Sequence, residues 1–245
     1  MGLFILMFLV ANLISCASVK TPAESLATET KVDYQKAAKI NAELAIVYTK
    51  RGMLDRAKEK LVKARSQSDK VAALYYAEGL YYQKLGRLQA AENAYQQAIS
   101  MAPKDYHAYN FYAQFLCRHK KDYVKANRLF QQSIALVDNI DLSTTFTLYG
   151  ECLLQQGQIK AATKTFHQAI ENDSNAAKAY WELANIYYQA NNYKQAESMI
   201  NIFIALAGNS AKNLTLKMHI LERLGKNNEA ATIRLQLSSQ AYGDH

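Results

Sequence analysis

Residues 72–105, AALYYAEGLYYQKLGRLQAAENAYQQAISMAPKD, contain the pattern that decides the fold. Two segments with apolar residues at helical spacing are separated by Gly86, and Pro103 follows the second segment. This spacing predicts two helices that each bury one face. Gly79 in the first segment and Ala91 in the second are small, so the two helix backbones can approach each other closely. The stretch therefore predicts a helical hairpin.

The same pattern recurs along the chain at a spacing of about 34 residues. The small residue of the first helix is Ala45, Gly79, Ala113, Gly150 or Ala184, and that of the second helix is Ala57, Ala91, Ala126, Ala162, Ala196 or Ala230. The copies are assigned to residues 38–71, 72–105, 106–142, 143–176, 177–210 and 211–244. The third copy is slightly long, because His119-Lys120-Lys121-Asp122 stands where a glycine turn is expected.

These copies resemble the tetratricopeptide repeat, a helix–turn–helix unit with conserved small and aromatic positions. The predicted fold class is all-α, a right-handed α-solenoid of six tetratricopeptide (TPR) repeats covering residues 38–244. A single repeat cannot bury its apolar face alone, so stacking on the neighbouring repeats completes the core. The sixth copy matches the pattern least well, as expected of a repeat that caps the stack.

Composition agrees with a helical protein and argues against several other classes. The chain has only two prolines and nine glycines, so it contains few helix breakers. The formal net charge of +8 could indicate nucleic acid or an anionic membrane. However, Lys and Arg are spread along the whole chain, which is typical of solvated helix faces. We therefore expect no nucleic acid as a partner. A small-molecule substrate is not expected either.

The N-terminus has the features of an export signal. Residues 3–14, LFILMFLVANLI, are too short to span a bilayer but suit a signal peptide. The run leads to Leu13-Ile14-Ser15-Cys16, which resembles a bacterial lipobox, although no Lys or Arg precedes it. The prediction is a signal peptide at 1–15, a lipid on Cys16 and a polar tether at 16–37; in the alternative, Cys16 is only an apolar residue of the signal.

In the TPR family, set positions of each first helix line a groove that binds peptides. Here those positions hold a mixture of amide, aromatic and basic side chains, which suits an extended or helical peptide. The predicted groove residues are Tyr76, Leu80, Gln83, Asn110, Gln114, Arg118, Trp181 and Asn185. Trp181 has two interpretations, an anchor for the partner or a partly buried packing residue. The Lys and Asn set that binds two carboxylates in chaperone-binding relatives is absent.

No motif indicates catalysis. The chain lacks a glycine-rich phosphate loop, an H-E-x-x-H motif and a C-x-x-C motif, and its five histidines are dispersed. We therefore expect no enzyme, no cofactor and no metal site. Cys117 and Cys152 are 35 residues apart, about one repeat, on first helices that should pack side by side. In an oxidising compartment this spacing favours a disulfide, with two separate buried thiols as the alternative.

Together, the lipobox, the six repeats and the length resemble the PilF/PilW family of type IV pilus biogenesis lipoproteins. Residues 109–117, YNFYAQFLC, resemble the family's Asn-Asn-Tyr-Gly-x-Phe-Leu-Cys stretch, and Cys152 follows Gly150 as it does in that family. Phe111 and Ala113 depart from the family pattern.

The resemblance implies a pilotin, a lipoprotein that helps the secretin subunit reach the outer membrane and assemble into a ring. Ala17, in place of aspartate after the lipidated cysteine, favours the periplasmic face of the outer membrane. Two alternatives remain. One is a lipoprotein adaptor that recruits a periplasmic protease or cell-wall hydrolase, and the other is a cytosolic secretion chaperone.

Overall fold

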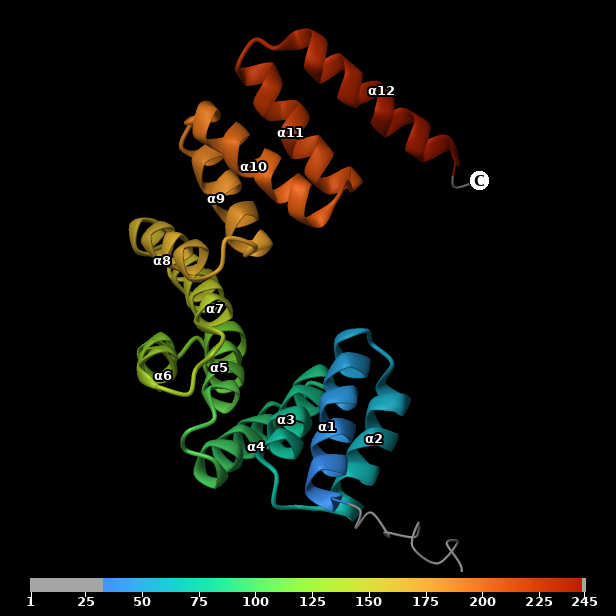
Figure 1. Ribbon diagram of the computed structural model, residues 1–245, viewed down its shortest axis with the longest axis vertical. Coiled ribbons are helices and arrows are strands. Elements are labelled where there is room, and N and C mark those ends of the chain that lie inside the picture. The colour runs from blue at the N-terminus through green and yellow to red at the C-terminus, as the bar shows by residue number, and fades with distance from the viewer. Residues whose placement is uncertain (1–32, 244–245) are drawn as a thin grey trace, which may run out of the picture. The chain divides into compact units, whose positions relative to one another are not determined.

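The computed structural model describes residues 33–243, in which the regular structure is helical and forms six hairpins (Figure 1). The first helices of the hairpins are α1 (Tyr34–Lys50), α3 (Ala72–Lys84), α5 (Tyr106–Phe115), α7 (Leu142–Gln155), α9 (Ala177–Gln189) and α11 (Ala211–Arg223). The second helices are α2 (Leu54–Gln67), α4 (Leu88–Met101), α6 (Tyr123–Ala135), α8 (Ile159–Asn172), α10 (Tyr193–Ala207) and α12 (Asn227–Gly243). The prediction of six TPR hairpins is confirmed.

Neighbouring hairpins pack in chain order. The two helices of each hairpin contact each other, and the second helix also contacts the first helix of the next hairpin, as α4 contacts α5. From α1 to α9 the first helices contact one another in sequence, so α3 lies against α1 and α5, and α7 lies against α5 and α9. First-helix side chains of these successive repeats are therefore brought next to one another.

The small first-helix residues are required by aromatic rings on the second helices. A Cβ atom on Gly79 would lie 2.5 Å from a ring carbon of Tyr95, and one on Gly150 would lie 2.6 Å from a ring carbon of Phe166. Both rings are fully buried. The close crossing of the two helices in these hairpins therefore depends on the absence of a side chain, as the sequence pattern predicts.

The turn of the third hairpin differs from the others. Gly86 and Gly157 occupy the turns of the second and fourth hairpins with φ of 72°, a conformation that favours glycine. The third hairpin instead extends α5 by a short π-helix, η2 (Leu116–Lys120), and Lys121 adopts φ of 56° without being a glycine. Asp122 then begins α6, because its carboxylate accepts a hydrogen bond from the backbone N–H of Lys125.

A disulfide joins the third and fourth hairpins. Cys117 in η2 and Cys152 in α7 are bonded, with their Cα atoms 5.8 Å apart. Both residues are buried. The bridge predicted from the spacing of these cysteines is confirmed, and it ties the irregular end of α5 to the neighbouring first helix.

Residues 1–32 lie outside the described part of the chain, and with them the predicted signal peptide, Cys16 and the predicted tether up to residue 32. α1 begins at Tyr34, four residues before the predicted start of the first repeat at residue 38. The additional residues belong to the same compact unit as the repeats. Within residues 33–243, no helix combines the length and apolar character that crossing a membrane requires.

Candidate functional site

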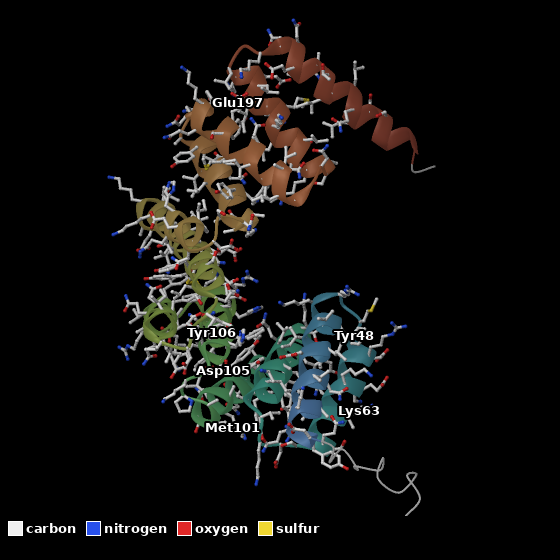
Figure 2. The ribbon with its side chains drawn as sticks, viewed as in Figure 1. Tyr48, Lys63, Met101, Asp105, Tyr106 and Glu197 are labelled. Atoms are coloured by element: carbon white, nitrogen blue, oxygen red, sulfur yellow. A yellow bond between two sulfur atoms is a disulfide. The ribbon has the colours of Figure 1, made fainter. Side chains whose placement is uncertain are left out.

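A hollow of about 390 Å³ opens over the first helices of the second, third and fourth hairpins, and we call it the α5 hollow. It is lined by Lys50, Leu80, Gln83, Lys84, Tyr106, His107, Asn110, Phe111, Gln114, Arg118, Asp141, Thr144 and Leu148. Figure 2 marks its position through Tyr106, which lies at the start of α5. Five of the eight predicted groove residues are gathered here, namely Leu80, Gln83, Asn110, Gln114 and Arg118.

The other three predicted groove residues lie elsewhere. Tyr76 is only 3% exposed and stacks on Phe111, with ring centroids 5.0 Å apart. Trp181 packs against Phe203 beside a separate, smaller hollow, and Asn185 lines a third one. Trp181 is partly buried and has Lys212 over its ring at 4.8 Å. The structure therefore does not join these residues into the same site.

Apolar side chains form part of the wall of the α5 hollow. Leu80 of α3, Phe111 of α5 and Leu148 of α7 all line it. The ring of Phe111 stacks on the ring of buried Tyr76. The ammonium group of Lys50 lies 5.9 Å from the centre of the Phe111 ring. This wall can bury an apolar side chain of a bound polypeptide.

Asn110 provides an acceptor that the protein itself does not use. Its side-chain N–H donates to Thr145 Oγ1 at 2.8 Å, and the Thr145 hydroxyl in turn donates to the backbone carbonyl of Asp141. These bonds fix the orientation of the Asn110 amide. Asn110 lines the hollow and is only 5% exposed, and its Oδ1 atom is buried without a hydrogen-bond partner. A buried acceptor left in this state is costly unless a ligand supplies a donor.

Charges on this surface are paired toward the C-terminal repeats. Arg118 donates to Glu151 at 2.8 Å, Glu151 also pairs with Lys178 at 3.5 Å, and Lys178 pairs with Glu182 at 2.7 Å. Burial opposes ionisation of Lys178, but its bonds to both carboxylates outweigh burial and raise its pKa. The chain of ion pairs therefore leaves little free charge over α7 and α9.

Toward the N-terminal repeats the surface keeps an excess of positive charge. Lys50 and Lys84 line the α5 hollow and form no ion pair with any described residue. The pKa of His119 is lowered, first by burial and then by the charges of Arg118, Lys121 and Lys84. This shift has the sign expected for a histidine that is partly buried among cations.

Several lining residues were not predicted from the sequence. Lys50, Phe111, Asp141 and Leu148 were absent from the predicted groove set. The repeat register contained a signal for Lys50, because it occupies the same position as Lys84 and Arg118 in the following repeats. Asp141 could not be found in this way, because it lies in the connection before α7, where its carboxylate accepts from the backbone N–H of Thr144.

The described residues hold no cluster of side chains suited to binding a metal ion. In residues 33–243, no group of three His, Cys, Asp or Glu side chains is placed to bind a metal ion. The α5 hollow offers amides, cations, the carboxylate of Asp141 and an apolar wall, a mixture found at protein-binding surfaces.

Two tetratricopeptide repeat models match the chain, one over residues 76–138 and the other over residues 153–211. The first match contains α5 and most of the residues that line the α5 hollow. Together the matches support the TPR assignment from the second to the fifth hairpin.

Among curated proteins, the chain is 24% identical to the type IV pilus assembly protein PilF of Pseudomonas aeruginosa, over 80% of this chain and 77% of PilF. A solved structure of P. aeruginosa PilF superposes with a TM-score of 0.70 and 22% identity, covering 86% of this chain and 94% of the other.

Two further proteins of similar sequence or structure have different described functions. A structure of PilW, described as a widely conserved type IV pilus biogenesis factor, gives a TM-score of 0.70 at 21% identity, covering 82% and 92% of the two chains. The human mitochondrial import receptor subunit TOM70 is 28% identical over 71% of this chain, but only 31% of its own length is covered. None of these relatives is named as an enzyme, in agreement with the prediction of a non-catalytic protein.

Proposed function

We propose that this chain of six tetratricopeptide repeats acts in type IV pilus biogenesis by binding the secretin subunit. One observation carries the proposal: PilF matches this chain in sequence over 77% of its own length, and the structures of PilF and PilW match it over 94% and 92% of theirs. TOM70, by contrast, is matched over less than a third of its length. On this proposal the protein helps secretin subunits to reach the outer membrane and to form a ring.

The α5 hollow is the proposed contact for a segment of the secretin subunit. It combines an apolar wall, an unpaired buried acceptor on Asn110 and unpaired cations. The disulfide between Cys117 and Cys152 lies beside it and holds η2 against α7. A binding surface made from rigid helices loses little conformational entropy when the partner binds.

We further propose that the protein is anchored by lipid on Cys16 at the periplasmic face of the outer membrane. The support is the sequence of residues 3–16, an apolar run followed by a lipobox-like Leu-Ile-Ser-Cys. Lipid chains stabilise attachment by about 0.8 kcal/mol for each buried methylene group. The tether after Cys16 then allows the repeats to reach a partner in the periplasm.

Deletion of the gene tests the proposal. Unheated membrane samples on a denaturing gel should lose the slowly migrating secretin multimers, and surface pili should disappear. Re-expression of the wild-type chain should restore both, whereas Cys16→Ser should restore neither fully and should not incorporate radioactive palmitate.

Co-purification identifies the partner independently of the deletion phenotype. The tagged full chain, extracted from outer membranes with detergent, should bring down the secretin subunit. Recovery of a protease or cell-wall hydrolase in place of secretin would support the adaptor alternative. Normal secretin multimers in the deletion strain would contradict the proposal.

A further inference from the structure

A ladder of cations runs across the first three repeats at the α5 hollow. Lys50, Lys84 and Arg118 occupy the same register position in successive repeats, each 34 residues after the last. They stand at or just beyond the C-terminal ends of α1, α3 and α5. All three line the same hollow, so the repeat places them along one surface.

Only the first two cations of this ladder are free to meet a ligand. Arg118 is paired with Glu151, whereas Lys50 and Lys84 have no ion-pair partner among the described residues. The corresponding residues of the next two repeats are Gln155 and Gln189, so the ladder ends where the paired charges begin.

Helix stability alone does not account for this arrangement. A cation in the last turn of a helix interacts favourably with the helix dipole and stabilises the helix. However, α7 and α9 form with glutamine at this position, so the fold does not require the charge. The dipole also gives no reason for Asn110, which lines the same hollow and whose buried Oδ1 atom has no hydrogen-bond donor.

We infer that the α5 hollow binds a polypeptide segment in the polyproline II conformation with two acidic side chains three residues apart. Adjacent packed helices lie about 8–10 Å apart. Polyproline II has three residues per turn and advances about 3.1 Å per residue, so side chains at positions i and i+3 lie on one face about 9 Å apart. Carboxylates at these two positions therefore match Lys50 and Lys84, and an apolar side chain of the segment contacts Phe111. The inference rests on the proposed function only in requiring a polypeptide partner.

A peptide array tests the inference without any secretin. The array holds nine-residue peptides of serine with one leucine, acetylated and amidated, carrying two aspartates in every possible arrangement. The full-length chain, purified in detergent, is applied and detected by antibody. The strongest signal should come from peptides whose aspartates are three positions apart, and it should fall with added salt. Equal signals for all spacings, or no signal, would overturn the inference.

Substitutions then identify the surface. Lys50→Gln and Lys84→Gln should each weaken binding of the best peptide about two- to fivefold, as loss of an exposed ion pair predicts. Lys63→Gln is the matched control, since Lys63 is an exposed lysine of α2 that does not line the hollow (Figure 2). Equal effects of all three substitutions would also overturn the inference.

A charge exchange separates binding from folding. Lys84→Glu should lose the peptide with two aspartates and gain one in which the matching aspartate is replaced by lysine. A variant that had merely unfolded would bind neither peptide, and its helical circular dichroism would reveal it; Lys84→Gln then supplies the answer. Failure on the array with intact secretin co-purification would refute this inference alone, whereas the reverse result would refute the secretin proposal alone.

Discussion

Replacing Gly150 by alanine tests the close helix crossing on which the repeats depend. The new Cβ atom would lie 2.6 Å from a ring carbon of Phe166, where ordinary carbon contacts are about 3.5–4.0 Å. The ring is fully buried, so it has to move by about 1 Å against packed neighbours. Overpacking of this kind costs about 1–3 kcal/mol. Alanine in a helix gains about 1 kcal/mol over glycine, so the free energy of unfolding should fall by roughly 0–2 kcal/mol.

A double-mutant cycle makes the test decisive. Phe166→Leu removes the ring, and in that background Gly150→Ala should raise the free energy of unfolding, by up to about 1 kcal/mol. Urea titration followed by circular dichroism at 222 nm measures all four proteins. The expected result is a change of sign between the two backgrounds. If Gly150→Ala stabilises the wild-type protein by the same amount, the ring contact does not limit the crossing and the reasoning is wrong.

Three further changes have defined outcomes. Replacing Cys117 and Cys152 together by alanine opens a loop of 35 residues and should lower the free energy of unfolding by up to about 4 kcal/mol in urea titration; no change would contradict a stabilising bridge. Burial opposes ionisation of Glu92, but its hydrogen bonds, first that of Lys120, outweigh burial and lower its pKa. The ionised Glu92 therefore stabilises the fold above the unfolded pKa of about 4.3, and this stabilisation is lost as pH falls through the lower folded pKa. Glu92→Gln should therefore lower the melting temperature at pH 7 more than at pH 3, and equal losses would refute this. Lys121→Gly should raise the melting temperature, since φ of 56° costs a non-glycine residue about 1 kcal/mol; a lower value would refute it.

The hairpins and the disulfide could be predicted from the sequence because they depend on local register. Helical spacing fixes which side chains of one hairpin face each other, and a constant repeat length carries that register to the next hairpin. Cys117 and Cys152, about one repeat apart, are therefore brought together by the same rule that pairs the helices. The turn of the third hairpin could not be predicted in this way, because Lys121 adopts a positive φ that is uncommon for lysine.

The site was only partly predictable, because exposure depends on neighbouring repeats. Tyr76 occupies a groove position in the register, but Phe111 of the next repeat covers it. Trp181 and Asn185 also occupy groove positions, but they belong to the fifth repeat, which is too far along the chain of repeats to line the α5 hollow. A fixed list of groove positions treats every repeat alike, whereas the partners of each side chain differ from one repeat to the next.

Photo-crosslinking in living cells tests most directly whether the α5 hollow meets the secretin subunit. A benzophenone amino acid replaces Gln114, which lines the hollow, and in a matched strain it replaces Lys63 on α2. After irradiation, the Gln114 strain should yield an adduct that mass spectrometry identifies as the secretin subunit, and the Lys63 strain should not. Adducts at Gln114 that contain other proteins but no secretin would contradict the account.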